Sequence, residues 1–238
     1  MKRTLVLLFA LALAAPPLAT AARAQTRYAL PEPAHSATGA EVRIRLMSGA
    51  PFAAEELPAA ELRDVRLERL WRSGRVGLEL DDAGGAATFH ATAPGVQLIA
   101  YVPRDEAGSA ADVASYGKAL VVVGPASRKE QIWRSELGQR LEIVPATDPV
   151  ALLESGGTLE VQILFRREPL AGATVVAVAE GAPAESYRRA VTDTFGHARF
   201  DLDRPGRWLV HLAHKSYERG DDPGWSLFQS SLLLVSGP

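Results

Sequence analysis

The residues best suited to chemistry are two histidines and three acids near the C-terminus of the 238-residue chain. His211 and His214 lie three positions apart, and Glu218, Asp221 and Asp222 follow them. Imidazole and carboxylate groups together suit divalent transition metals. Residues three apart in an extended strand point to opposite faces, so both histidines reach one ion only if the strand ends or bulges between them. We treat this cluster as a candidate metal site, with strand-edge histidines beside a solvated acidic loop as the alternative.

The other histidines are dispersed along the chain. His35 lies in a proline-rich segment near the start of the sequence, and we keep it as a further candidate ligand. For His90 and His197 we expect exposed positions on strands or turns. Only His35 therefore joins the candidate metal-binding set.

The sequence carries no signature of an enzyme. It has no cysteine, which excludes a thiolate nucleophile, a disulfide framework and Cys-ligated zinc. It contains no Gly-x-Ser-x-Gly, His-Glu-x-x-His, phosphate-binding or dinucleotide-binding motif. Adjacent acids such as Asp81 and Asp82 lie in a predicted turn, where carboxylates are usually solvated. We therefore predict binding rather than catalysis.

Three tryptophans have positions that can be interpreted. Trp208 alternates with Val210 and Leu212, which predicts core packing. Trp225 follows a Pro-Gly turn and precedes a strand, so we expect core or inter-sheet packing for it as well. Trp133 lies in a polar stretch and is the best candidate for a ring at a domain interface or facing a ligand.

The elements that must position these residues are strands. Apolar residues alternate with polar ones in many short segments, and Gly, Pro and Asp turns separate them. The predicted strands are Glu41–Met47, Arg75–Leu80, Gln97–Val102, Leu141–Val144, Thr158–Phe165, Thr174–Val178, His197–Leu202, Arg207–Leu212 and Leu227–Val235. Only Ala53–Arg63 and Ala110–Tyr116 suggest helix, each one or two turns long. This pattern is typical of antiparallel β-sandwiches.

The length after the N-terminal segment fits two domains of about 100 residues each. We predict an all-β fold of two tandem immunoglobulin-like antiparallel β-sandwich domains. The boundaries are 25–125 for the first domain, 126–139 for a linker and 140–238 for the second domain.

The N-terminal segment, residues 1–24, predicts a cleaved signal peptide. Lys2 and Arg3 precede an uncharged apolar run, and Ala22 and Ala24 give small residues before the cleavage point. The run is too short for a membrane span, and no cysteine follows it for lipid attachment. Removing it changes the formal charge from −2 to −5, because it carries three basic residues and no acid. We expect a periplasmic or secreted protein that neither binds nucleic acid nor inserts into the membrane after cleavage.

Several ordered motifs resemble a family of exported bacterial proteins catalogued as domain of unknown function 4198. The similar segments are Val42–Leu57, Gly138–Leu152, Leu159–Val178 and Thr192–His214, followed by Trp225 and the last strand. Members are often labelled as a periplasmic component of cobalt or nickel uptake. Many begin with a histidine followed closely by an aromatic residue, whereas here His35 is followed by Ser36 and Ala37.

Two functions remain open at this point. The resemblance implies an exported accessory protein that delivers or senses nickel or cobalt, with a membrane transporter component as a partner. The alternative is a structural or adhesive module that binds a protein or a glycan without metal. The alternative predicts an exposed aromatic patch, with Trp133 as the first residue to inspect.

Overall fold

A computed structural model describes residues 25–62, 64–81, 86–104, 113–125, 131–218 and 224–235. The predicted signal peptide lies outside the described residues. The first half contains β1 (Thr26–Glu32), β2 (His35–Ser36), β3 (Glu41–Ala50), β4 (Ala53–Glu56), α1 (Ala59–Leu62), β5 (Val65–Trp71), β6 (Gly74–Leu78), β7 (Ala86–His90), β8 (Gly95–Pro103) and β9 (Val113–Val123). The second half contains η1 (Ile132–Arg134), β10 (Leu141–Pro145), α2 (Pro149–Ser155), β11 (Gly157–Phe165), β12 (Glu168–Pro169), β13 (Thr174–Ala179), η2 (Ala184–Ser186), β14 (Arg188–Val191), β15 (His197–Leu202), β16 (Arg207–Glu218) and β17 (Gly224–Val235).

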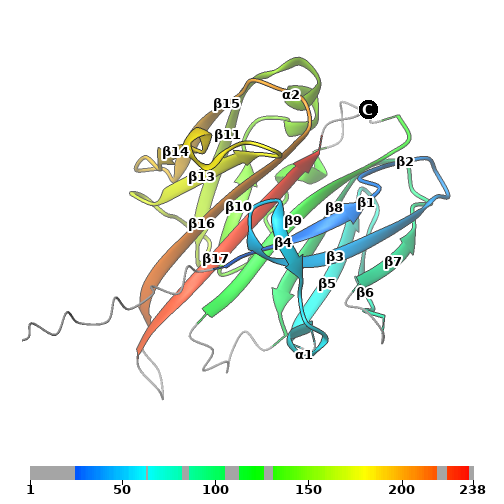
Figure 1. Cartoon of the computed structure of the whole chain (residues 1–238), viewed down its shortest axis with the longest axis horizontal. Helices are drawn as coiled ribbons and strands as arrows, with labels where there is room; N and C mark the ends of the chain where they lie inside the picture. The colour runs from blue at the N-terminus through cyan, green and yellow to red at the C-terminus, as the bar shows by residue number, and fades with distance from the viewer. Residues whose placement is uncertain are drawn as a thin grey trace, which may run out of the picture.

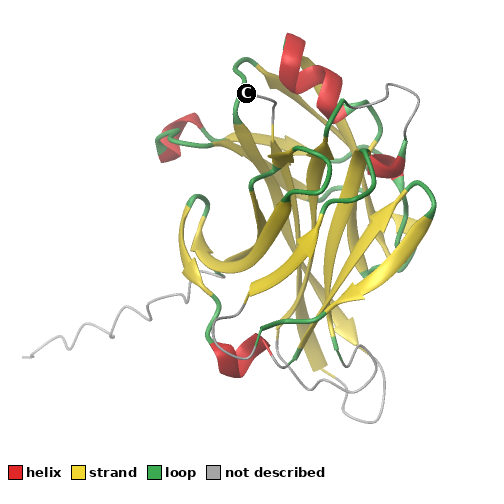
Figure 2. Cartoon of the chain, turned by 90° about the vertical axis from the view of Figure 1, so that its right-hand side faces the viewer, coloured by secondary structure: helices red, strands yellow, loops and turns green. Residues whose placement is uncertain are grey.

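The strands form three sheets (Figure 1). The N-terminal sheet contains β1, β3, β4 and β7, and the C-terminal sheet contains β10, β11, β12 and β15. Between them lies the central sheet, whose strand order is β14-β13-β16-β17-β9-β8-β5-β6, with β2 on β9. The side view shows strands throughout, with short helical turns at the periphery (Figure 2). None of the helices in the described ranges is both long and apolar enough to cross a lipid bilayer.

Two hydrophobic cores lie on opposite sides of the central sheet. Strand β9 contributes Leu120 and Val122 to the core beneath the C-terminal sheet, and Ala119 and Val121 to the core beneath the N-terminal sheet. This division follows from the period of two in a strand, since alternate side chains point to opposite faces. The predicted all-β fold of packed sheets is therefore confirmed.

The pairing of β17 with β9 connects the two halves of the chain. The two strands run parallel, from Leu227 opposite Val113 to Leu233 opposite Ala119. The short β2 also pairs with β9 in parallel, whereas the other strand pairs of the described residues are antiparallel as predicted. Strands before and after the predicted linker thus share one sheet, and the division into residues 25–125 and 140–238 stays a prediction.

The predicted helix at Ala110–Tyr116 is not found where the structure can test it. Residues 110–112 lie outside the described ranges, and Val113–Tyr116 is the start of β9. Pairing of Val113–Tyr116 with β17 outweighs the weak local helical tendency of this segment.

A buried ion pair forms hydrogen bonds with the predicted linker and holds it against the central sheet. Lys118 of β9 and Glu142 of β10 are each 1% exposed and form a salt bridge. Lys118 Nζ also donates to the Ser135 carbonyl at 2.9 Å, and Glu142 accepts from the backbone N–H groups of Leu137 and Gly138. Burial lowers the pKa of Lys118, and the Glu142 carboxylate opposes that change.

Candidate functional site

The structure places His211 and His214 on opposite faces of β16. The His211 Nδ1 atom lies 3.4 Å from Thr26 Oγ1, on the side of the N-terminal sheet. The His214 ring packs edge-on against Phe165 of the C-terminal sheet, with ring centroids 4.7 Å apart. Strand β16 pairs regularly with β17 through this region, without a bulge between the histidines. In this conformation the two imidazoles therefore do not reach one ion.

The remaining candidate ligands are also separated. Glu218 forms salt bridges with Arg140 and Arg166. Asp221 and Asp222 lie outside the described residues. His35 pairs with Val122 at the other end of β9, and burial lowers its pKa against the opposing effect of Glu154. Within the described ranges, no group of three or more His, Asp or Glu side chains is placed to hold a metal ion.

The side of the central sheet that faces the N-terminal sheet is only partly covered. On β16, Leu209 is fully buried beneath the N-terminal sheet, whereas Lys215 and Tyr217 on the same side are exposed. The cover ends where Thr26, the first residue of β1, contacts His211. Below that point β16 and β17 continue past the N-terminal sheet (Figure 1).

We call this uncovered region the open face. Strand register brings its side chains into rows, because directly paired residues point to the same side of a sheet. One row joins Arg189, Val176 and His211, and a second joins Lys215, Leu227 and Val113. The members are Val113, Thr174, Val176, Arg189, Val191, His211, Ala213, Lys215, Tyr217, Trp225, Leu227 and Gln229.

An aromatic pair forms the end of the open face. Trp225 is 61% exposed and Tyr217 is 49% exposed. Their rings meet edge to face with centroids 5.6 Å apart, and the Lys215 Nζ lies 5.3 Å from the Trp225 ring. The predicted packing of Trp225 in a core is wrong, because this part of the hairpin extends past the sheet that would cover it.

Trp208 and Trp133, the other tryptophans with a predicted position, are both buried. Trp208 is 1% exposed, which confirms its predicted core position. Trp133 is 5% exposed and packs in the core beneath the C-terminal sheet, so its ring is not open to a ligand. That core contains residues from both predicted domains, and the alternative of a ring at a domain interface stays a prediction. Its segment is polar overall, but the short η1 turn directs this ring inward.

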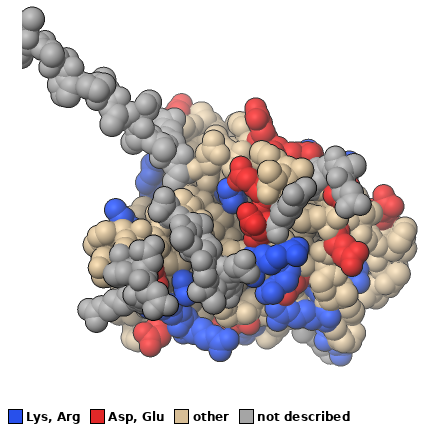
Figure 3. Space-filling view, turned by 90° about the horizontal axis from the view of Figure 1, so that it is seen from below, with Lys and Arg blue, Asp and Glu red and all other residues tan. Residues whose placement is uncertain are grey.

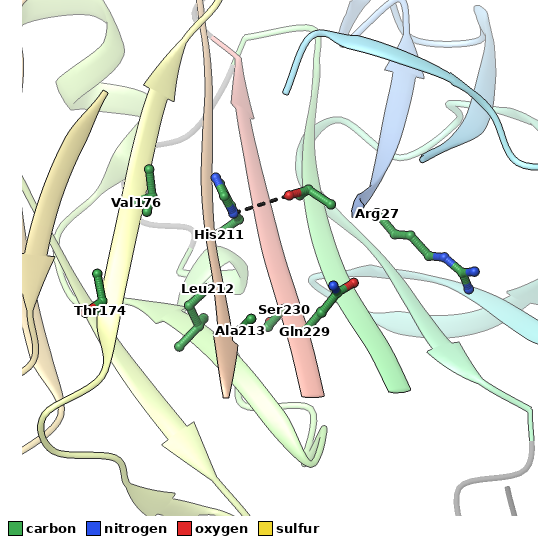
Figure 4. A pocket seen from close by; sticks show the side chains of 9 residues that line it. Arg27, Thr174, Val176, His211, Leu212, Ala213, Gln229 and Ser230 are labelled. Carbon is green, nitrogen blue, oxygen red and sulfur yellow. Dashed lines mark hydrogen bonds between the residues drawn. The ribbon is translucent and has the colours of Figure 1, made fainter. Parts of the chain in front are cut away.

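A cavity of about 290 Å³ lies at the covered end of the open face (Figure 4). It is lined by Thr26, Arg27, Thr174, Val176, His211, Leu212, Ala213, Gln229 and Ser230. Burial, with a smaller effect from the positive charge of Arg189, lowers the pKa of His211 from its ordinary 6.5 to about 4. His211 is therefore neutral at pH 7, and hydroxyl, amide and neutral imidazole groups supply the polar part of the wall.

The fold and the open face define an all-β protein that exposes one face of a sheet beside a small polar cavity. A family model described as "Domain of unknown function (DUF4198)" matches residues 22–216. The chain belongs to this family.

No curated protein matches the chain. Solved structures with similar segments include a Salmonella alpha-2-macroglobulin reacted with methylamine, at 12% identity and a TM-score of 0.25. The match covers 88% of this chain but only 15% of that one. The D0-D1 domain of intimin matches at 15% identity and a TM-score of 0.24, covering 88% of this chain and 97% of that one. A putative membrane anchored protein from Corynebacterium diphtheriae matches at 12% identity and a TM-score of 0.26, covering 90% and 59%.

Proposed function

We propose that this is an exported, non-enzymatic binding protein that holds a glycan on the open face without a metal ion. The proposal rests on the exposure of Trp225 and Tyr217, held as a pair on a regular hairpin. Large aromatic side chains usually bury most of their area, so an exposed pair on a sheet is favourable chiefly when a partner covers it. A sugar ring offers an apolar face for such a ring and hydroxyl groups for the polar neighbours.

The polar residues of the open face have a spacing that suits an extended chain of sugars. Alternate residues on one side of a strand are about 7 Å apart, so His211, Ala213, Lys215 and Tyr217 span about 20 Å. Lys215 can donate beside the aromatic pair, and Gln229 and Thr174 carry an amide and a hydroxyl nearer the cavity. A linear partner of several units could contact this whole length.

The metal hypothesis gains no support from the site. A nickel or cobalt site formed by the predicted histidines would need both imidazoles on one side of β16, and Glu218 is already paired with two arginines. The glycan proposal keeps the predicted export to the periplasm or the cell exterior, and it does not require a membrane transporter component as a partner.

The proposal can be tested by affinity electrophoresis of the purified chain. The gels contain barley β-glucan, xylan or polygalacturonate, and a parallel pull-down uses peptidoglycan sacculi. We expect retardation or pull-down by at least one glycan, and a loss of about tenfold or more in affinity for Trp225→Ala. Phe195→Ala is the matched control, because Phe195 is 70% exposed on the turn between β14 and β15, outside the open face.

Two results would contradict the proposal. One is that none of the four glycans binds the wild-type chain. The other is that Trp225→Ala and Phe195→Ala weaken glycan binding equally, which would place recognition elsewhere on the molecule. Binding of a protein that depends on Trp225 in the absence of any glycan binding would assign the open face to a protein partner instead.

A further inference from the structure

The loop between β11 and β12 has an unusual composition for its backbone geometry. It consists of two residues, Arg166 and Arg167, because Phe165 pairs directly with Glu168. Both arginines have positive φ, at 54° and 68°. Two-residue hairpin loops of this kind strongly favour Asn-Gly, since a larger side chain crowds the backbone in the left-handed region. Strain of this type is retained most often where the side chains have a function.

The two arginine side chains are directed towards residues far away in the sequence. Arg166 Nη2 forms an ion pair with Glu218 Oε2, and Arg140 Nη1 lies 3.8 Å from the same oxygen atom. Two guanidinium groups from separate segments therefore meet at one carboxylate oxygen. The guanidinium groups of Arg140 and Arg166 can therefore contact a single anionic group at the same time.

Arg167, the second residue of the loop, directs its guanidinium group towards Gly138, two residues before Arg140. A Cβ atom built on Gly138 would lie 2.7 Å from Arg167 Nη2 and 3.1 Å from its Nε. A side chain at position 138 would have to displace this guanidinium group. Among the described residues, Arg167 has no carboxylate partner.

The charges of the cluster do not balance. Among the described residues that these contacts join, Arg140, Arg166 and Arg167 carry three positive charges and Glu218 carries one negative charge, an excess of +2. Each guanidinium has five N–H donors, more than one carboxylate can accept. Figure 3, which views the molecule from below, shows basic side chains mainly in its lower half.

We propose that Arg140, Arg166 and Arg167 form a binding site for a phosphate group. A phosphate carries about −1.5 to −2 charges at neutral pH and accepts several charge-assisted hydrogen bonds, which matches the excess charge and the free donors. Glu218 holds two of the guanidinium groups in place beside it. The site lies on the side of β16 opposite the open face, where Glu218 meets the β11–β12 loop, so the proposal is independent of glycan binding on the open face.

The test is titration calorimetry of the purified chain in a buffer free of phosphate and sulfate. Inorganic phosphate, glycerol phosphate and acetate are the three ligands. We expect saturable heat with a phosphate ligand and binding of acetate weaker by about tenfold or more. Heat with both phosphate ligands assigns free phosphate or a monoester, and heat with glycerol phosphate alone assigns a monoester.

A double variant separates the function of the arginines from their structural effect. Replacing Arg166→Asn and Arg167→Gly gives the loop its favoured residues, so we expect an unchanged or higher Tm together with loss of the phosphate heat. Arg140→Gln should weaken binding, and Arg199→Gln is the control because Arg199 pairs with Glu160 outside the cluster. The proposal is overturned if the wild type gives no heat with either phosphate ligand, if acetate binds as tightly, or if the double variant binds like the wild type.

Discussion

The side of the central sheet that faces the N-terminal sheet has a covered part and an open part. Leu209 and Leu233 in the covered part are fully buried, whereas Tyr217 and Trp225 on the same two strands are 49% and 61% exposed. Both parts have the same strand pairing and the same alternation. The difference is what lies opposite, since the N-terminal sheet begins at Thr26. Apolar and aromatic residues of the same two strands thus pack in a core in the covered part and form an exposed surface in the open part.

The largest expected effect concerns the buried ion pair on the other side of the same sheet. Lys118→Met leaves the Glu142 carboxylate buried without its cation, and we expect a loss of about 3–5 kcal/mol in the free energy of unfolding. The double variant Lys118→Met with Glu142→Leu should recover much of that loss. Urea unfolding of the three proteins measures both effects, and a single variant as stable as the wild type would contradict the account.

A substitution in the covered part should cost nearly as much. Leu233→Ala removes a side chain that is 0% exposed, and we expect a loss of about 2–5 kcal/mol from lost burial and the cavity that remains. The same urea experiment measures it. A loss below about 1 kcal/mol would show that the N-terminal sheet does not pack on this part as described.

His211 lies at the boundary between the two parts, and its contribution to the free energy of unfolding should depend on pH. Because the folded protein lowers the pKa of His211 to about 4, the unfolded chain binds more protons than the folded one between that value and about 6.5. The stability from neutral His211 is complete above pH 6.5 and is lost as the pH falls through this window, on the order of 3 kcal/mol in total.

The variant His211→Gln isolates this contribution from the other titrating groups. We expect its free energy of unfolding to fall less than that of the wild type between about pH 7.5 and about pH 4.5. Urea unfolding at the two pH values gives the comparison. Equal pH dependence in both proteins would show that His211 titrates normally and that the covered end of the open face is accessible to water.

The smallest expected effect on stability belongs to the open part. Trp225→Ala removes an exposed ring, and we expect the free energy of unfolding to change by no more than about 0.5 kcal/mol. A loss similar to that of Leu233→Ala would mean that the aromatic pair stabilises the fold, and the contrast between the two parts would disappear.

Local patterns predicted much of the secondary structure. The sequence predicts a strand at His197–Leu202, and this segment forms β15. Its buried and exposed residues alternate, because one face of the strand packs inward. The turn before it also depends on nearby residues: Asp193 Oδ1 accepts from the N–H groups of Phe195 and His197, and Gly196 has a φ of 77°. These features depend only on neighbouring residues, so local sequence patterns can predict them.

Features set by distant residues could not be predicted. The parallel pairing of β17 with β9 joins positions more than 100 residues apart, and no local pattern encodes it. The sequence does carry one overlooked signal for the open face. Lys215 and Tyr217 alternate before the Asp222-Pro223-Gly224 turn, and Trp225 and Leu227 alternate after it, which indicates a hairpin with these four side chains on one side. What leaves that side open is the position of the N-terminal sheet.

The central claim is that a glycan binds the open part and leaves the covered part unchanged. The most direct test is to follow the tryptophan indole N–H signals in ¹H–¹⁵N spectra while adding the glycan that retards the chain in electrophoresis. We predict that the signal of Trp225 shifts with saturation while the signals of Trp208 and Trp133, both buried, stay in place. A saturable shift elsewhere in the spectrum with the Trp225 signal unmoved would contradict the claim.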